Sequence, residues 1–287
     1  MRLWNGAPSG MRIVIGLEDT FGDIVGKASA GVKVSAEALG SRTGIATARL
    51  KAFMADQQKP TEDEARKIAA ELGLDPAKLV DSGLERWKPQ TRDLDSKFGH
   101  QINEPYPSNG YFIVEPDERV AAFVDPGGSP ENIVSTLRKS PVSVRYLLLT
   151  HKHKDHVDAL AEVRRAFPEA RVVIHRNDVA AVGAPAEGAI GIDDGGTLPF
   201  GNSEIRLMHT PGHTDGSSCF IYSGTVFTGD TLFAGSVGRL FGDRFGYSDL
   251  MHSVSKKIFA LPDDTVVFPG HGPPSTIGEE KAHNPFF

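Results

Sequence analysis

Residues 145–156 read RYLLLTHKHKDH, and this stretch decides the fold class. The apolar run from Tyr146 to Leu149 is short and is typical of a buried strand. Four side chains that can bind a metal follow within six positions: His151, His153, Asp155 and His156. Imidazole and carboxylate groups suit zinc, manganese or iron. The stretch therefore predicts a metal site on a loop that leaves a sheet.

The same arrangement recurs three times further along the chain. The predicted strands Glu204–His209, Thr225–Gly229 and Thr265–Gly270 lead to His213, Asp230 and His271, respectively. A lone histidine after a strand is more often a satisfied polar residue than a ligand. Here five of the ten histidines share this position with two aspartates, so we expect one common metal centre.

Composition limits the classes of function. The 287 residues are 39% hydrophobic and 24% charged, as in ordinary globular proteins, and the net charge of −6 argues against a protein that mainly binds nucleic acid or an anionic membrane. The single cysteine, Cys219, excludes a disulfide framework and a cysteine-rich zinc site. The apolar run Met11–Leu17 is too short for a signal sequence or a membrane span, so we expect a cytoplasmic protein without membrane contact.

Two regions differ in their apolar period. Residues 17–87 place apolar side chains at helical spacing, with Ser35 and Thr61 as predicted helix starts. Residues 105–287 contain short β-branched and aromatic runs separated by helical segments, which indicates an α/β or mixed layered domain. We therefore expect an extension (1–16), a helical domain (17–87), a linker (88–104) and a catalytic domain (105–287).

Four motifs occur in a fixed order: His-x-His-x-Asp-His at 151–156, Gly-His at 212–213, Gly-Asp-Thr at 229–231 and Pro-Gly-His at 269–271. In this order they resemble the metallo-β-lactamase superfamily. The resemblance implies an αββα sandwich, here preceded by a small all-helical domain, with a site for two divalent ions at the ends of the sheets. Zinc is the first expectation, and iron and manganese are the alternatives. By resemblance, the first ion is held by His151, His153 and His213, the second by Asp155, His156 and His271, and Asp230 bridges the two.

A two-metal site implies hydrolysis by a shared hydroxide. Two ions roughly 3.5–4 Å apart lower the pKa of a water between them, so that no serine or cysteine nucleophile is needed. Asp155 is the candidate catalytic carboxylate that orients this hydroxide. Cys219 is interpreted as an apolar strand residue. The histidines outside the motifs are expected to be structural: His100, His175, His209, His252 and His283.

Two further segments narrow the branch of the superfamily. Residues 229–239 and 269–287 resemble the short glyoxalase II-like enzymes and also the persulfide dioxygenases. We expect a thioester hydrolase of the hydroxyacylglutathione hydrolase type, with a mononuclear-iron persulfide dioxygenase and then a lactonase as alternatives. Relatives usually continue Gly-Arg with Thr-Asp-Phe, whereas here Gly238-Arg239 is followed by Leu-Phe-Gly, which weakens any transfer of a glutathione site. Arg239 and Tyr247 are the candidate substrate-binding residues.

The helical region suggests a different class of function. Residues 35–75 resemble the helix-turn-helix of Cro/repressor-like domains, with the recognition helix at about 46–55, so the alternative is a DNA-binding regulator with a metal-binding domain. Residues 17–88 hold 11 Lys/Arg against 12 Asp/Glu, and the candidate helix offers Arg49 and Lys51 among mostly apolar residues. DNA binding needs several cations on one face. We therefore expect this region to cover part of the catalytic domain, to shape the cleft or to form a homodimer contact. The main partner is expected to be a small-molecule thioester.

Overall fold

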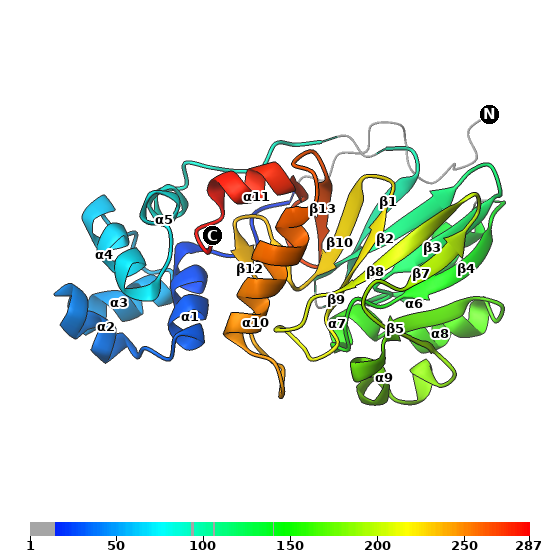
Figure 1. Cartoon of the computed structure of the whole chain (residues 1–287), viewed down its shortest axis with the longest axis horizontal. Coiled ribbons are helices and arrows are strands. Elements are labelled where there is room, and N and C mark those ends of the chain that lie inside the picture. Colours follow the sequence, from blue (N-terminus) through cyan, green and yellow to red (C-terminus); the bar gives the residue numbers. More distant parts are fainter. Residues whose placement is uncertain (1–14, 93–94, 106, 140) are drawn as a thin grey trace.

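The computed structural model describes residues 15–92, 95–105, 107–139 and 141–287. Two six-stranded sheets lie face to face, helices cover their outer faces, and a bundle of helices lies beside one of these layers (Figure 1). This arrangement confirms the predicted αββα sandwich preceded by helices. The predicted extension 1–16 falls almost entirely outside the described residues.

Local signals define the helices of the bundle. They are α1 (Phe21–Gly31), α2 (Ala36–Thr43), α3 (Thr47–Met54), α4 (Glu62–Leu72) and α5 (Pro76–Gly83). The predicted helix starts are confirmed, because the hydroxyls of Ser35 and Thr61 accept hydrogen bonds from backbone N–H groups in the first turns of α2 and α4. Glu64 completes a capping box with Thr61. Gly73 ends α4 with φ +71°, a conformation that glycine adopts without strain.

The first sheet carries the histidine-rich loop. Its strands, in spatial order, are β1 (Phe98–Asn103), β2 (Ser108–Glu115), β3 (Val120–Val124), β4 (Ser143–Leu148), β5 (Arg171–His175) and β6 (Ile190–Ile192). Strands β3 to β6 run parallel, so the loops that follow them leave from one edge. Their outer face packs on α6 (Pro130–Arg138), α8 (Leu160–Ala166) and α9 (Arg176–Val182). The short helix α7 (Lys154–Val157) follows β4.

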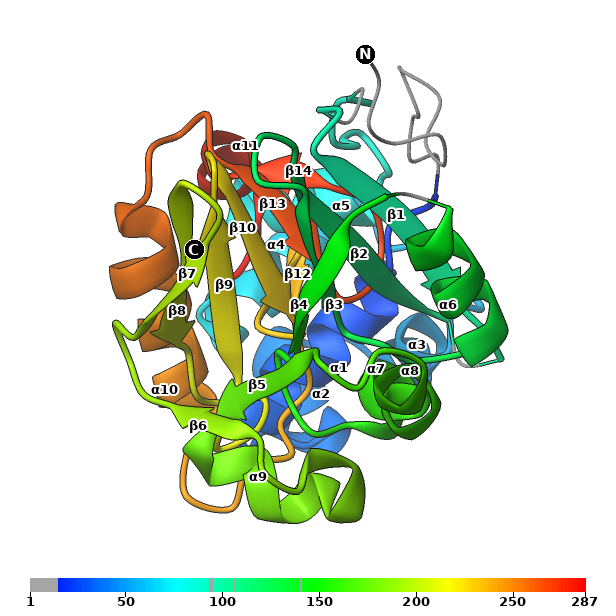
Figure 2. The same ribbon diagram turned by 90° about the vertical axis from the view of Figure 1, so that its right-hand side faces the viewer.

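The second sheet carries the other candidate ligands. Its spatial order is β14 (Ser275–Thr276), β13 (Val266–Pro269), β10 (Thr225–Gly229), β9 (Ser218–Tyr222), β8 (Ser203–His209) and β7 (Thr197–Phe200). A small hairpin follows β10, formed by β11 (Leu232–Phe233) and β12 (Ser236–Val237). The outer face is covered by α10 (Tyr247–His252) and α11 (Ile277–His283). Figure 2 shows the order α10, second sheet, first sheet, α6 and α8 across the molecule.

Three apolar cores hold these layers together. One lies between the sheets and contains the aromatic rings of Phe98, Tyr111 and Phe227, which pack at tilted or edge-on angles around Phe268. Another lies between the first sheet and its helices. The third is continuous from the bundle to the helices that cover the second sheet. The bundle is therefore packed onto the two-sheet sandwich, which is one of the alternatives that the sequence predicted.

Two further observations bear on the sequence predictions. Strand β1 lies inside the stretch 88–104 that was expected to be a linker, so the sheet begins before residue 105. Among the described residues, no helix is both long and apolar enough to cross a bilayer.

Candidate metal centre

The predicted ligands come from four loops that meet at one edge of the sandwich. Each loop follows a strand: β4, β8, β10 or β13. All seven side chains are brought together there: His151, His153, Asp155, His156, His213, Asp230 and His271.

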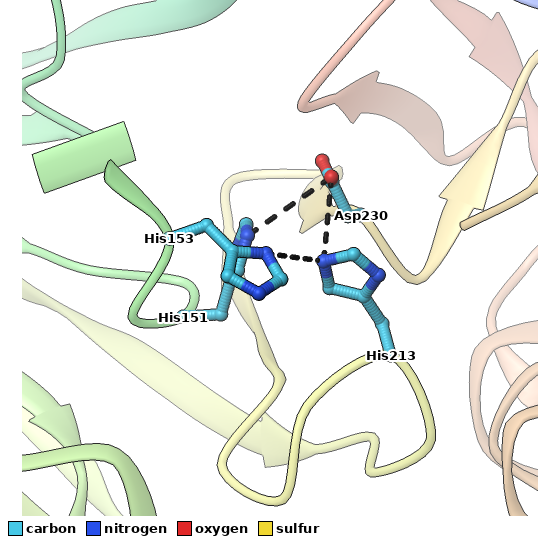
Figure 3. Close-up of side chains that lie close together, drawn as sticks. All are labelled: His151, His153, His213 and Asp230. Carbon is cyan, nitrogen blue, oxygen red and sulfur yellow. Dashed lines mark hydrogen bonds and ion pairs between the residues drawn. The ribbon is translucent and has the colours of Figure 1, made fainter. Parts of the chain in front are cut away.

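One group consists of three histidines and one aspartate, shown in Figure 3. The ligand atoms of His151, His153, His213 and Asp230 all lie within 4.8 Å of one another. Nε2 of His213 is 2.9 Å from Nδ1 of His153 and 3.4 Å from Oδ2 of Asp230. Three nitrogens and a carboxylate oxygen at this spacing match the ligand set of a divalent transition-metal ion.

The second group lies beside the first. Oδ2 of Asp155 is 3.2 Å from Nε2 of His271 and 3.4 Å from Nε2 of His156. Asp230 lies between the groups, since its Oδ1 is 3.4 Å from Nε2 of His156 while its Oδ2 faces His213. Its Oδ2 also lies 3.6 Å from Nε2 of His271, so the carboxylate contacts both groups, as a bridging ligand must.

Unpaired buried atoms show that these residues fit metal ions. Within the described part of the chain, Nε2 of His151 and Oδ1 of Asp230 are buried without a hydrogen-bond partner. Buried polar atoms are rarely left so, and a missing ion is a common reason. Burial lowers the pKa of His151 well below its usual value and that of His213 to about 4, which favours the neutral imidazole that a metal needs.

A carboxylate that sequence reasoning missed supports these ligands. Asp125 follows β3 and accepts hydrogen bonds from both the backbone N–H and the hydroxyl of Thr150, each at 2.7 Å. Its Oδ2 is also 2.9 Å from Nδ1 of His156. Asp125 thus fixes the start of the histidine-rich loop and turns Nε2 of His156 toward the centre. Its place just after an apolar strand was the available signal.

Small residues let the loops approach closely. A Cβ atom at Gly270 would lie 2.3 Å from Oδ1 of Asp230, so only glycine fits between the ligands there. A Cβ atom at Gly238 would lie 1.9 Å from the carbonyl oxygen of Asp230. These loops are therefore placed by backbone contacts as well as by side chains.

A cavity of about 180 Å³ opens onto the centre, and the bundle contributes to its wall. It is lined by Glu18, Asp19, Asp23, Lys27, His213, Asp230, Phe233, Arg239, Phe241 and His271. Phe241 is 56% exposed, and its ring centroid lies 5.0 Å from that of His153. Sequence reasoning missed Phe241 and the four residues of the bundle.

The two candidate substrate residues occupy different places. Arg239 lines the cavity, but its Nη2 donates to Oδ1 of Asp23 at 2.8 Å. Tyr247 packs against α1, where a Cβ atom at Gly31 would come within 2.3 Å of its ring, and it does not line the cavity.

The residues expected to be structural lie away from the seven. Cys219 is fully buried in β9, and burial raises its pKa to about 12, which leaves it an inert thiol. His175 and His209 stack on each other with ring centroids 3.8 Å apart. His100 pairs with Asn109.

Comparison with known proteins identifies the family. The sequence profile of the metallo-beta-lactamase superfamily matches residues 103–271. Hydroxyacylglutathione hydrolase GloC of Haemophilus influenzae is 33% identical over 191 residues, which cover 61% of this chain and 90% of that protein.

Three solved structures are similar to about two thirds of the chain. The BLEG-1 B3 metallo-beta-lactamase is 33% identical, with a TM-score of 0.59, and the match covers 98% of its length. ETHE1 from Myxococcus xanthus is 28% identical, with a TM-score of 0.59, and the match covers 83% of its length. TTHA1623 in a di-iron-bound form is 31% identical with a TM-score of 0.57 over its full length, and each match covers 66% of this chain. The profile match spans more than half of the chain, which therefore belongs to the metallo-beta-lactamase superfamily, as a metallo-hydrolase with glyoxalase II-like homologues.

Proposed function

We propose that the protein is a glyoxalase II-like thioesterase that uses two divalent metal ions. The observation that carries this proposal is the carboxylate of Asp230, which lies between the two ligand groups and faces histidines of both. The hydroxyacylglutathione hydrolase among the relatives supports thioesters as the substrate class. We propose zinc as the metal, with iron and manganese as alternatives, and the di-iron form of one neighbour supports the count of two.

The ligand groups would divide as the motifs imply. His151, His153 and His213 would hold one ion and Asp155, His156 and His271 the other, with Asp230 between them. Ions bound there would lower the pKa of a shared water and polarise the thioester carbonyl. In hydrolysis, the water oxygen adds to the carbonyl carbon, the carbon–sulfur bond breaks, and the thiol leaves with a proton.

We assign Asp155 the role of orienting the attacking water. Its side chain is 25% exposed, whereas that of His156 beside it is fully buried, so the carboxylate is open to solvent on one side. It lies in the second ligand group, at the start of α7. From this position it can orient the water.

The cavity suits a small acyl group. Its volume of about 180 Å³ is below the roughly 300–1,000 Å³ of pockets that enclose drug-sized ligands. Phe241 offers an exposed apolar face at the rim. We therefore assign Phe241 to contact the acyl chain, while the thiol part of the substrate extends outside.

A persulfide dioxygenase with one iron is the second candidate. The ETHE1 neighbour partly fits it, and the same ligand residues could hold a single iron. A lactonase is the third candidate. Only the products and the metal content separate the three.

One panel tests the proposal. The purified full chain is analysed for bound metal and then assayed with acylglutathione thioesters, with glutathione persulfide in an oxygen electrode, and with lactones. We expect thioester turnover with about two metals per chain. Oxygen uptake with one iron per chain would overturn the thioesterase proposal in favour of the dioxygenase.

A DNA-binding role for the bundle has less support. Nη2 of Arg49 lies 2.8 Å from Oε2 of Glu64, and Nζ of Lys51 lies 2.8 Å from Oε1 of Glu37, so both cations of the candidate recognition helix are paired. We propose packing on the sandwich as the main role of the bundle. Salt-dependent retention on nonspecific DNA that is lost in an Arg49→Ala, Lys51→Ala variant would contradict this.

Location and assembly remain proposals as well. We propose a cytoplasmic monomer or homodimer that binds no membrane. Cell fractionation and sedimentation of the purified chain test these two points.

A further inference from the structure

The segment 237–239 lies between the metal centre and helix α1. Its Arg239 carbonyl oxygen accepts a hydrogen bond of 2.6 Å from Nδ1 of His213. Because this bond keeps the proton on Nδ1, it leaves Nε2 of His213 free to face Asp230. The position of the segment therefore sets the orientation of a candidate ligand of the first ion.

The segment has no room to move independently of the ligands. A Cβ atom at Gly238 would lie 1.9 Å from the carbonyl oxygen of Asp230 and 3.0 Å from Nδ1 of His213. A displacement of the segment would therefore be passed directly to the His213 ring and to the backbone of Asp230.

Helix α1 holds the segment at both ends. Nζ of Lys27 donates to the carbonyl oxygen of Val237 at 2.7 Å, and Asp23 accepts from Arg239 at 2.8 Å. The Lys27 side chain is only 5% exposed and is paired with the equally buried Asp19. Its ammonium group also lies 4.9 Å above the centre of the Phe233 ring.

A buried lysine needs a compensating set of contacts. Removing an ammonium group from water costs several kcal/mol unless hydrogen bonds and a counter-charge replace the lost solvent. Lys27 receives one hydrogen-bond acceptor from the sandwich and its counter-charge from the bundle. Lys27 thus joins the bundle to the sandwich through contacts of defined direction, which apolar packing alone does not supply.

Helix α1 lies outside the part of the chain that the family profile matches, residues 103–271. We propose that α1 is a positioning element of the metal centre, in which Lys27 fixes the segment 237–239 and thereby the orientation of His213. This inference rests on the metal centre of the proposed function, but not on the thioester substrate. Loss of the link should weaken the first ion site much more than the second, because the second shares Asp230 with the first but does not include His213.

The main test uses the double variant Asp19→Asn, Lys27→Met, which removes the charge pair without leaving a buried carboxylate alone. Each ion site is isolated in the full chain: His271→Ala leaves the first site, and His213→Ala leaves the second. Zinc affinity is then measured by competition with a chelator in both backgrounds. We expect a loss of about 10-fold or more in the first site, as for other supporting contacts of ligands, and less than about twofold in the second.

A matched control breaks a pair inside the bundle. Arg49 and Glu64 link α3 to α4, far from the segment 237–239, so Arg49→Met, Glu64→Gln should lower thermal stability while both zinc affinities stay unchanged. Unchanged affinity of the first site in the Asp19→Asn, Lys27→Met variant would overturn the proposal. So would an equal loss in both sites that tracks thermal stability.

A second variant covers the case in which the double variant does not fold. Arg239→Met removes the exposed outer link to Asp23 and leaves α1 intact. We expect a loss of about two- to fivefold in the first site alone, because the Lys27 link remains. No change would overturn the proposal. Since these readouts need no substrate, failure of the thioesterase proposal would leave them standing.

Discussion

The helical bundle and the loops of the metal centre differ in how their polar side chains are paired. In the bundle, Arg49 is paired with Glu64, and the N-terminus of α4 is capped by Thr61. In the loops, buried atoms of His151 and Asp230 lack a hydrogen-bond partner among the described residues. Among the described residues of the bundle, only the Ser29 hydroxyl is buried without a partner, whereas in the loops two neighbouring candidate ligands each have such an atom, which marks the loops as the place where a ligand binds.

Removal of Asp230 should break this contrast with the largest effect. Asp230→Ala deletes the carboxylate that faces both ligand groups, so we expect loss of both metals and a fall in turnover of more than about 100-fold. Metal analysis and the thioester assay measure this. Asp194→Ala, which removes an exposed partner of Lys257, is the control that should keep both properties. Full metal content in Asp230→Ala would show that the bridging assignment is wrong.

Asp125 tests whether the support beneath the ligands matters. Asp125→Asn replaces one carboxylate oxygen by an amide nitrogen, which cannot accept a hydrogen bond from Thr150 or His156. We expect metal affinity to fall by about 10- to 100-fold, mostly at the site that includes His156. Chelator competition checks this, with the surface variant Asp117→Asn as control. An unchanged affinity would mean that His156 needs no partner on Nδ1.

Glu280 sharpens the comparison, because it is a buried carboxyl far from the metal ligands. It accepts hydrogen bonds from the Gly235 N–H and the Asn284 side chain, and burial raises its pKa from 4.5 to about 7. The folded state therefore binds the proton more tightly than the unfolded state, so this group adds stability below pH 4.5 that is lost as the pH rises to about 7.

In the Glu280→Gln variant, this group should no longer lower the free energy of unfolding as the pH rises, because glutamine does not titrate. Between pH 5 and pH 8, we expect the stability of the variant relative to the parent to increase by an amount on the order of 3 kcal/mol, for a shift of this size. Urea unfolding at both pH values measures the difference, with the exposed Glu169→Gln as control. The same pH dependence in the variant and the parent would refute the buried titration.

In the part of the bundle outside α1, the effect of a single polar group should be small and confined to stability. Thr61→Ala removes the cap of α4, so we expect a loss of about 1 kcal/mol in the free energy of unfolding. Metal content should not change. Urea unfolding combined with metal analysis tests both statements, and a loss of metal would mean that the bundle and the centre are coupled more widely than through α1.

The sequence predicted the seven side chains because their signal is local. His151 to His156 lie within one loop, and His213, Asp230 and His271 each follow an apolar strand directly. The strand pattern predicted a mixed layered domain, and the two-sheet fold was implied by the resemblance to a known superfamily. Both kinds of signal survive in a single sequence without any knowledge of long-range contacts.

Residues whose role depends on distant contacts could not be predicted. Asp125 supports His156 only because β3 lies beside β4, and Lys27 reaches Val237 across 210 positions of sequence. Strand β1 was placed in a linker because His100, Gln101 and Asn103 interrupt its apolar pattern at the edge of the sheet. In each case the deciding partner lies on another element, so the local pattern has no period or motif to reveal it.

The contact between α5 and the last residues has a consequence for the order of synthesis. The Asp75 N–H donates to the carbonyl oxygen of Pro285 at 2.8 Å, and Lys78 donates to the carbonyl oxygens of Lys281 and Phe287. Lys78 is synthesised 203 residues before Lys281, so the bundle gains these contacts late. On the ribosome, the bundle should stay sensitive to protease until residues 281–287 have left the exit tunnel, because these contacts form only then.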